Sequence, residues 1–256
     1  MVSKESKALY IEARIRADLD ELWARTQDPA RHRRWDLRFT EIEYLPRAED
    51  EPQRFRYATR VLPFLTVAGT GVSAGEKERP DGTRTSALRF HSPHPLSLIA
   101  EGSGYWRYVP DGDGVRFLTG YDYRPRWGAF GAFADRVLFR PLMGWATAWS
   151  FDRLRLWLER GIAPERALLN WLTELVVRAL VLTVCCTGLG LGPLVGLLGP
   201  LAPAVAFLCP LLLLVAISLA LLMAPLSGTP AARRCLRTPP ARVRAPRLLR
   251  TLENWS

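Results

Sequence analysis

The residue types that most often bind metals or act as general bases are few in this sequence. Its three histidines are His32, His91 and His94. His91 and His94 stand three residues apart in a proline-bounded loop, where they cannot share a helical face as ligands. His32 lies in an arginine-rich stretch that we expect to be solvated. The pattern therefore predicts no metal site.

Neither the glycine motifs nor the carboxylates of the sequence indicate a catalytic or cofactor site. The glycines at 69–71 and 102–104 lack the strand, loop and helix context of a phosphate site and are more typical of curved strands. Asp122 and Glu101 fall on the charged side of their strands, so we expect both to face water. The sequence thus predicts no catalytic residues and no cofactor, which favours a binding protein over an enzyme.

All four cysteines lie between positions 185 and 235, at Cys185, Cys186, Cys209 and Cys235. No pair has the CxxC spacing of a zinc site, and four free thiols suit a reducing compartment. The first sixteen residues lack the apolar core of a secretory leader, so we expect the N-terminal domain to stay in the cytoplasm. Acylation of Cys235, in the basic tail, is an alternative use of that thiol.

An uncharged stretch of 48 residues runs from 179 to 226. As one straight helix it would be about 72 Å long against a hydrocarbon core of about 30 Å, so it must fold back. The sequence GPLAP at 199–203 supplies a turn. We therefore predict an all-α transmembrane hairpin with helices over roughly 179–198 and 204–224.

Arginines flank both ends of this hairpin. Arg166 and Arg178 precede it and seven arginines follow it, whereas the turn is uncharged. By the positive-inside rule both termini are predicted to be cytoplasmic, with the hairpin in the inner (plasma) membrane. The hairpin contains no ionisable residue, so we expect an anchor rather than a transporter. The glycines between 188 and 196 would let helices pack closely, within the hairpin or in a homo-oligomer.

The net charge of +10 raises the question of nucleic-acid binding. Residues 227–256 hold seven arginines and one glutamate in a proline-rich stretch, which we expect to be mostly extended. Because the excess charge lies in this short tail beside the apolar segment and not in a stripe on a folded domain, we predict no nucleic-acid partner.

The N-terminal part carries strand patterns. Residues 9–16 alternate apolar and polar side chains, as a strand with one buried face does. The same alternation, strong or weak, returns in the segments 39–46, 54–61, 66–74, 84–91, 97–108 and 115–124. The sequence therefore predicts about seven strands in an antiparallel sheet with one wet face.

Helix signals lie between and after these strands. Asp18 can cap a short helix, and Asp28, followed by proline, can cap a second. Residues 130–160 repeat apolar side chains at spacings of three and four, which predicts one long helix with a bend at Pro141.

This order of strand, two short helices, six strands and long helix resembles the START-like, or SRPBCC, superfamily of polyketide cyclases and aromatases, lipid-transfer domains and coenzyme-Q-binding proteins. The resemblance covers about residues 5–160 and depends on the opening strand into DLDELW (18–23), the QDPARHRRWD step (27–36) and the long helix. It implies an α+β helix-grip fold, in which a seven-stranded antiparallel sheet wraps around a long C-terminal helix and encloses an apolar cavity.

The expected domain organisation has four parts. A START-like domain spans 5–160, a juxtamembrane helix 161–178, the two-helix transmembrane hairpin 179–226 and the basic tail 227–256.

The strand side chains that are expected to point inward, together with the resemblance, predict an aromatic, mostly apolar lining for the cavity. The predicted lining residues are Phe55, Tyr57, Phe90, Trp106, Tyr121, Tyr123, Phe130, Phe133, Leu138 and Leu142. A filled, aromatic-rich core would show the same pattern, so both interpretations remain open. The favoured function is a membrane-anchored domain that binds a small apolar ligand, such as a lipid, a quinone or a polyketide-like compound, at the cytoplasmic face. The alternatives are a protein-interaction scaffold with an oligomerising hairpin and a cyclase- or aromatase-type enzyme.

Overall fold

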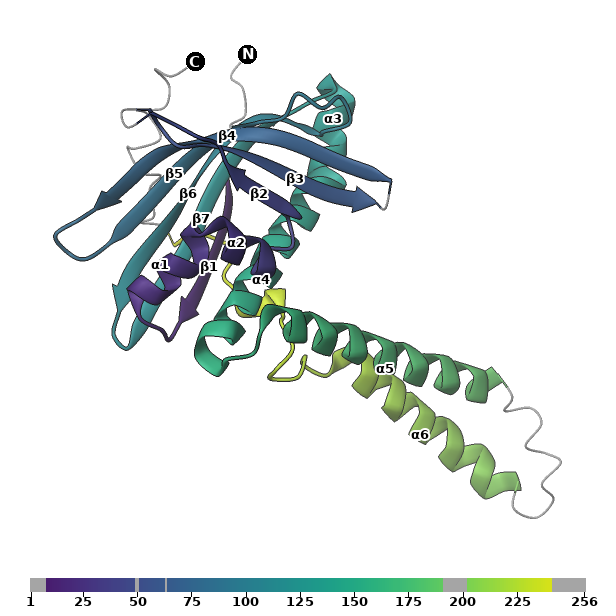
Figure 1. The fold of residues 1–256 in the computed structure, drawn as a ribbon. Coiled ribbons are helices and arrows are strands. Elements are labelled where there is room, and N and C mark those ends of the chain that lie inside the picture. Colours follow the sequence, from purple (N-terminus) through teal and green to yellow (C-terminus); the bar gives the residue numbers. More distant parts are fainter. Residues whose placement is uncertain (1–7, 49–50, 63, 191–201, 241–256) are drawn as a thin grey trace. The chain divides into compact units, whose positions relative to one another are not determined.

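A computed structural model describes residues 8–48, 51–62, 64–190 and 202–240 (Figure 1). The chain forms two compact units. The first consists of residues 1–165 together with 231–256, and the second of residues 166–230. The first unit is α+β and the second is built from helices.

Seven strands of the first unit form one sheet, in the order β1-β7-β6-β5-β4-β3-β2, and each neighbouring pair is antiparallel. The strands are β1 (Leu9–Ile15), β2 (Glu41–Tyr44), β3 (Arg54–Leu62), β4 (Leu65–Glu78), β5 (Arg84–His91), β6 (Ile99–Asp111) and β7 (Gly114–Pro125). The antiparallel sheet with helices confirms the predicted α+β class.

Two short helices follow β1, as the cap residues predict. The Oδ1 atom of Asp18 accepts hydrogen bonds from the backbone N–H groups of Asp20 and Glu21 and begins α1 (Leu19–Gln27). Asp28 accepts from Ala30 N at 2.8 Å and begins α2 (Pro29–Trp35). Each helix begins at a hydrogen bond between residues that are close in the sequence, which explains why the sequence alone predicts where the two helices begin.

The long C-terminal helix of this unit has three parts. These are α3 (Gly128–Ala134), the π-helical turn η1 (Asp135–Phe139) and α4 (Arg140–Arg160). Where the sequence predicted a bend at Pro141, the helix has a π-helical turn just before this residue. Proline lacks the N–H group that would continue the regular pattern of α-helical hydrogen bonds. Gly161, with φ of 65°, ends α4 in the left-handed conformation.

Aromatic rings fill the interior between α4 and the sheet around Phe117 of β7. The Phe117 ring lies 4.4 Å from that of Phe151 on α4 and 5.9 Å from that of Trp106 on β6. Trp35 of α2 closes the cluster, with its ring 6.1 Å from Phe151 and from Trp106. Phe117, Phe151 and Trp35 are fully buried, so this end of the interior is solid.

The second unit contains most of α5 (Pro164–Gly190) and α6 (Ala202–Leu222). By length and composition α5 is apolar enough to cross a membrane, and Phe207–Leu222 within α6 is a shorter apolar stretch. The predicted hairpin is thus supported for one helix, while the predicted turn and the end of the first span fall largely in residues 191–201, outside the described part of the chain. Pro210 lies inside α6.

The two helices of the second unit are held together by hydrogen bonds from Arg178 and by a close contact. Arg178 Nη1 donates to the carbonyl oxygens of Ala220 (2.8 Å) and Met223 (3.1 Å) at the C-terminal end of α6, while Nη2 bonds to Glu174 at 2.6 Å. At the other end a Cβ atom on Gly188 would lie 3.1 Å from the Leu213 side chain. Gly188 therefore serves packing between α5 and α6, which was one of the two predicted uses of the glycine run.

Residues 231–236 belong to the first unit, not to an independent tail. The 3-10 turn η3 (Ala232–Arg234) packs on α4, and Leu236 forms an isolated antiparallel bridge with Glu12 of the edge strand β1. Cys235 is buried, with its thiol 3.3 Å from the carbonyl oxygen of Ala148, and burial raises its pKa to about 12. This corrects the expectation of an extended tail for 231–236 and removes the exposed thiolate that acylation of Cys235 would need.

Candidate functional site

Strand pairing gathers five of the predicted lining residues at one part of the sheet face that carries α4. Phe55, Phe90 and Tyr123 stand in one row across β3 to β7, with Gly71 and Gly102 between them in register. Tyr57 on β3 pairs in the same way with Gly69 on β4, and Tyr121 lies two residues before Tyr123 on β7. Aromatic side chains and glycines therefore alternate across the strands on this face.

The glycines let three of the rings lie flat on the sheet. A Cβ atom on Gly71 would lie 2.2 Å from Cζ of Phe55, and one on Gly102 would lie 2.5 Å from Cζ of Phe90. A Cβ atom on Gly69 would similarly lie 2.4 Å from the hydroxyl oxygen of Tyr57. We call these three rings and their three glycines the aromatic floor. The glycines do more than ease curvature, because any other residue would lift a ring away from the sheet.

The helices lie mainly over other strands. Helix α4 packs on β1 and β7, α3 on β7 and α2 on β2, as Figure 1 shows. Phe55, Tyr57 and Phe90 are accordingly only half-buried, whereas the rings of Phe117 and Phe151 between α4 and the sheet are fully buried. The aromatic floor therefore belongs to a part of the inner face that the packed core does not fill completely.

Tyr57 is the polar side chain of the aromatic floor. Its ring contacts Phe39 and Phe55, with centroid separations of 5.8 and 6.4 Å. Burial raises its pKa to about 12, so the phenol is protonated at neutral pH. No hydrogen bond joins its hydroxyl to another residue in the described part of the chain.

Tyr121 and Tyr123 border the aromatic floor with hydroxyls that are already engaged. The Tyr121 hydroxyl is 3.0 Å from Oγ1 of Thr147 on α4, and the Tyr123 hydroxyl donates to Asp135 at 2.5 Å. Asp135 also accepts from Arg140 at 3.1 Å. Burial, reinforced by Asp135, raises the pKa of Tyr123. These contacts tie β7 to the helix and fix that edge of the inner face.

The other predicted lining residues lie elsewhere. Trp106 is buried within the solid aromatic cluster. Phe130, Phe133, Leu138 and Leu142 are more than half exposed, at 69, 65, 67 and 53 %. The structure therefore gathers Phe55, Tyr57, Phe90, Tyr121 and Tyr123 at one place, and puts the four helix residues on the surface.

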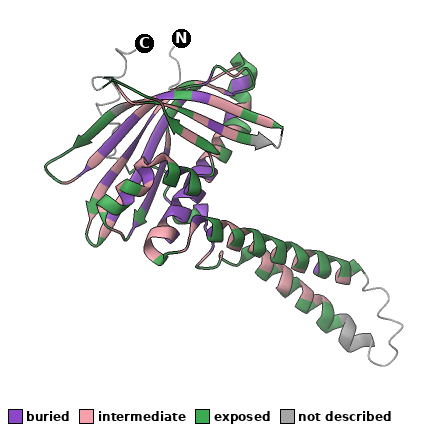
Figure 2. Ribbon diagram, in the orientation of Figure 1, coloured by how far each residue is buried: buried purple, intermediate pink, exposed green. Residues whose placement is uncertain are grey.

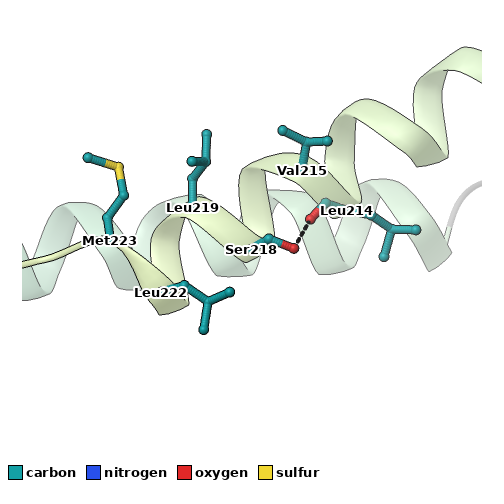
Figure 3. Close-up of a pocket in the computed structure, with 6 residues that line it drawn as sticks. All are labelled: Leu214, Val215, Ser218, Leu219, Leu222 and Met223. Atoms are coloured by element: carbon teal, nitrogen blue, oxygen red, sulfur yellow. Dashed lines mark hydrogen bonds between the residues drawn. The ribbon is translucent and has the colours of Figure 1, made fainter.

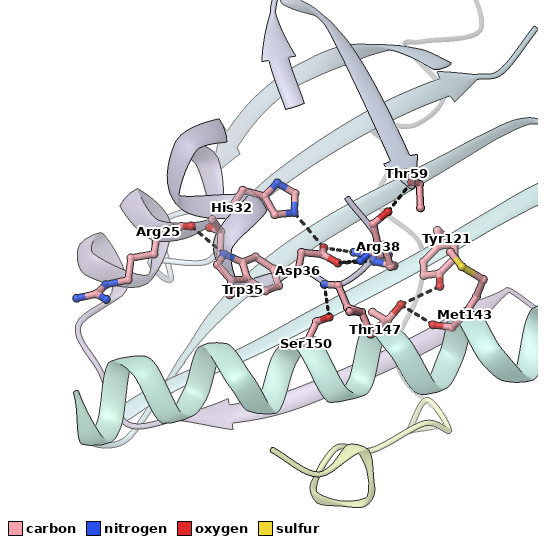
Figure 4. Close-up of polar contacts among 12 residues, drawn as sticks. Arg25, His32, Trp35, Asp36, Arg38, Thr59, Tyr121, Met143, Thr147 and Ser150 are labelled. Carbon is pink, nitrogen blue, oxygen red and sulfur yellow. Dashed lines mark hydrogen bonds and ion pairs between the residues drawn. The ribbon is translucent and has the colours of Figure 1, made fainter. Parts of the chain in front are cut away.

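A buried ionic cluster supports the inner face, and the sequence did not reveal it. Asp36 lies at the end of α2, where Arg38 donates to its two oxygens at 2.9 and 2.7 Å and His32 Nε2 lies at 3.0 Å (Figure 4). The expectation that His32 is solvated was wrong. The imidazole is buried and stacks on Trp35, with ring centroids 4.9 Å apart. The spacing of four residues between His32 and Asp36 on a helical turn was the available signal.

The protonation states in this cluster follow from burial and charge. Burial disfavours the Asp36 carboxylate, but the charge of Arg38 and the hydrogen bonds outweigh it, so the pKa of Asp36 lies well below its ordinary value. Burial, together with the charge of Arg38, lowers the pKa of His32 more than Asp36 raises it. A neutral His32 must carry its proton on Nε2, because an ionised Asp36 can only accept.

This cluster fixes position rather than performing chemistry. Leu37 N donates to Oγ of Ser150 on α4 at 2.9 Å, and Oγ1 of Thr59 on β3 donates to the Arg38 carbonyl oxygen at 2.5 Å (Figure 4). The segment between α2 and β2 is thereby tied to both α4 and β3. The guanidinium of Arg38 also lies 5.6 Å from the Tyr121 ring, so the cluster holds one side of the inner face in place.

We also considered a metal site and a surface groove as candidate sites. No group of three or more His, Cys, Asp or Glu side chains among the described residues could hold a metal ion. An open groove of about 410 Å³ runs along α6 in the second unit (Figure 3). It is lined by Leu214, Val215, Ser218, Leu219, Leu222 and Met223. Its one hydroxyl, on Ser218, donates to the Leu214 carbonyl within the helix, so the groove offers only an apolar helix face.

Comparison with known proteins identifies a membrane-protein relative. No protein-family model matches the sequence. The chain is 50 % identical over 161 residues to the uncharacterized membrane protein YndG of Bacillus subtilis (strain 168). The match covers 62 % of this chain and 60 % of YndG, less than two thirds of that protein's length.

Solved structures that resemble the chain include lipid-transfer and aromatase/cyclase proteins. A STAR-related lipid transfer protein from Xanthomonas axonopodis is 20 % identical with a TM-score of 0.43, covering 62 % of this chain and 97 % of that one. The Zhui aromatase/cyclase from Streptomyces sp. R1128 is 15 % identical with a TM-score of 0.39, covering 58 % and 95 %. At such low scores neither likeness assigns a function to this chain.

Proposed function

We propose that this protein is a membrane-anchored domain that binds a small apolar ligand, such as a lipid, a quinone or a polyketide-like compound, on the aromatic floor at the cytoplasmic face. The observation that carries the proposal is the set of half-buried rings laid flat on glycines beside a solid core. Apolar side chains with one well-placed polar group are the usual composition of a small-molecule site.

The aromatic floor suits an apolar ligand energetically. A ligand that covers the exposed parts of Phe55, Tyr57 and Phe90 gains about 25 cal/mol for each Å² of apolar surface removed from water. Tyr57 can add one hydrogen bond of about 0.5–1.5 kcal/mol to a carbonyl or hydroxyl of the ligand. The ionic cluster and the Tyr121 and Tyr123 contacts hold the surrounding backbone before binding, which lowers the entropy cost of association.

Membrane anchoring is supported by α5, which is apolar enough to cross a membrane, and the number of crossings follows from the chain segments on either side of the second unit. Glu165 accepts two hydrogen bonds from Arg34, at 2.8 and 3.0 Å, and Ala231 N donates to Asp152 at 2.7 Å. Both contacts lie inside the first unit. A segment that leaves and re-enters one folded unit must cross a bilayer an even number of times, which favours the hairpin with both flanks on the cytoplasmic side.

Catalysis is not part of the proposal. His32, Asp36 and Arg38 satisfy one another in the interior, and Asp135 is engaged by Tyr123 and Arg140. These groups therefore hold the fold, and a ligand on the aromatic floor meets rings and the Tyr57 hydroxyl.

Native mass spectrometry of the full chain tests ligand binding. The protein is isolated in nanodiscs of two different lipid compositions, and its bound small molecules are released and identified. We expect one ligand that accompanies the protein in both preparations, whereas loosely associated lipids change with the nanodisc. If every bound molecule simply follows the supplied lipid, the proposal is wrong.

A further inference from the structure

The surface formed by α3 and η1 is unusually apolar for a segment that faces water. Residues 127–134 read WGAFGAFA and contain no charged or hydroxyl side chain. The side chains of this segment and the next turn that stand outward are Trp127, Phe130, Phe133, Val137, Leu138 and Leu142, each at least 43 % exposed. We call these six residues the α3 patch, and α3 is coloured largely as exposed in Figure 2.

The backbone holds these rings outward. Trp127 has φ of 67° and Gly128 φ of 56°, so the chain turns sharply from β7 into α3 through two left-handed residues. A Cβ atom on Gly131 would lie 1.6 Å from the Arg126 carbonyl oxygen, which keeps the first turn of α3 close to the end of β7. Val137 and Leu138 of the π-helical turn that follows are exposed as well.

The segment that carries the α3 patch has a positive net charge. Between residues 126 and 142 the sequence has three arginines and one acid, Asp135. Asp135 is buried and bonded to Tyr123 and Arg140, whereas Arg136 is exposed. Exposed aromatic and aliphatic side chains with basic residues beside them are typical of segments that lie in a membrane interface.

We infer that the α3 patch docks onto an anionic bilayer surface, with Phe130 and Phe133 entering the boundary between headgroups and acyl chains and Arg136 among the lipid phosphates. Lipid is the favoured occupant because the same chain carries α5, a helix apolar enough to span a bilayer. The inference rests on the membrane anchoring in the proposed function, and it is independent of ligand binding at the aromatic floor.

Depth-dependent fluorescence of the full chain in vesicles tests the inference. Cys186 and Cys209 are replaced by serine, and an environment-sensitive fluorophore is attached to one new cysteine, at Phe133→Cys, Phe64→Cys or Leu212→Cys. Phe64 is an 85 % exposed phenylalanine of the same unit outside the α3 patch, and Leu212 is an exposed residue of α6. The vesicles contain phosphatidylcholine alone or with phosphatidylglycerol, with and without lipids carrying a quencher on the acyl chain.

We expect emission at position 133 to shift to the blue and to be quenched by the labelled lipids, more strongly when phosphatidylglycerol is present, while position 64 stays unquenched. Arg136→Gln should lower the ratio of docked to undocked protein about fivefold in the anionic vesicles. If the label at position 133 is unquenched while the label at position 212 is quenched, docking of the α3 patch is refuted and membrane anchoring is not. A blue shift without quenching at 133 would mean that protein covers the α3 patch and would also overturn it. An unquenched label at 212 would refute the anchoring itself, and docking with it.

Discussion

Replacing Gly71 by alanine distinguishes an open aromatic floor from a filled core. The new methyl group would lie 2.2 Å from Cζ of Phe55, against about 3.5–4.0 Å for an ordinary carbon contact, so the ring must move. The three nearest atoms all belong to the outer end of this ring, and none of them is a backbone atom. If the space above is open, lifting the ring costs about 0.5–1.5 kcal/mol of rotamer strain, partly offset by about 0.5–1 kcal/mol from removing a glycine from a strand.

Gly120 provides a matched control on the other face of the sheet. A Cβ atom there would lie 2.7 Å from the Tyr105 ring, in nearly the same cross-strand geometry. Tyr105 is only 7 % exposed and packs with Tyr10, Ala87 and Leu118, so its ring has nowhere to go. Overpacking of this kind costs about 1–3 kcal/mol.

Thermal unfolding of the full-length variants gives the comparison. We expect Gly71→Ala to change the unfolding temperature by less than about 3 °C and to abolish the co-purified ligand, because the lifted ring occupies its place. Gly120→Ala should lower the unfolding temperature by about 3–10 °C without displacing the ligand from the folded fraction. Equal destabilisation by the two substitutions would show that the space over Phe55 is filled, and would refute the open floor.

The same contacts and the hairpin topology give four further predictions. Tyr57→Phe keeps the ring and should weaken ligand binding several-fold, as measured by ligand occupancy in native mass spectrometry, with an unchanged unfolding temperature; unchanged occupancy would exclude a bond to the hydroxyl. Asp36→Asn leaves Arg38 buried beside a neutral amide and should cost about 3–5 kcal/mol in chemical unfolding, whereas a loss below about 1 kcal/mol would contradict the ionic cluster. Burial lowers the pKa of His32, so below about pH 6.5 the folded state binds fewer protons than the unfolded state and the free energy of unfolding should fall as the pH drops from 7 to 5. His32→Gln should flatten this pH dependence, and a slope that persists in the variant would assign it to another group. A reporter fused after Ser256 should be active only in the cytoplasm, and activity on the outer side would mean an odd number of crossings.

Local patterns explain most of the secondary structure that the sequence predicts. The alternation at 9–16 predicts β1, and the carboxylates of Asp18 and Asp28 predict the starts of α1 and α2. Each of these features is decided by a residue and its nearest neighbours along the chain, through side-chain parity or a cap hydrogen bond.

The surface position of Phe130 and Phe133 shows where a periodic pattern misleads. The spacing of apolar residues over 130–160 assumed one regular helix, but a π-helical turn intervenes. An extra residue in a helical turn rotates the residues before it by about 100° relative to the residues after it. The residues of α3 that continue the inward-facing spacing of α4 therefore point outward. Sequence periodicity alone cannot register that change of phase.

The remaining parts of the site depend on which distant residues meet. Phe55 and Gly71 are 16 positions apart and Phe90 and Gly102 are 12 apart, and only the register of the sheet sets one over the other. His32 is buried because Trp35, Phe39 and Trp106 surround it, although its neighbours in the sequence are arginines. Residues 231–236 return to α4 after a whole unit of chain has intervened.

The sequence by itself determined the strands, the caps, the α+β class and the long uncharged segment, because side-chain parity, hydrogen bonding and hydrophobic length act over a few neighbouring residues. Only the tertiary structure decided which rings lie on glycines, which charges become buried and which apolar side chains stay in water. Those outcomes are set by packing between segments that are distant along the chain, and packing is a property of the whole folded unit.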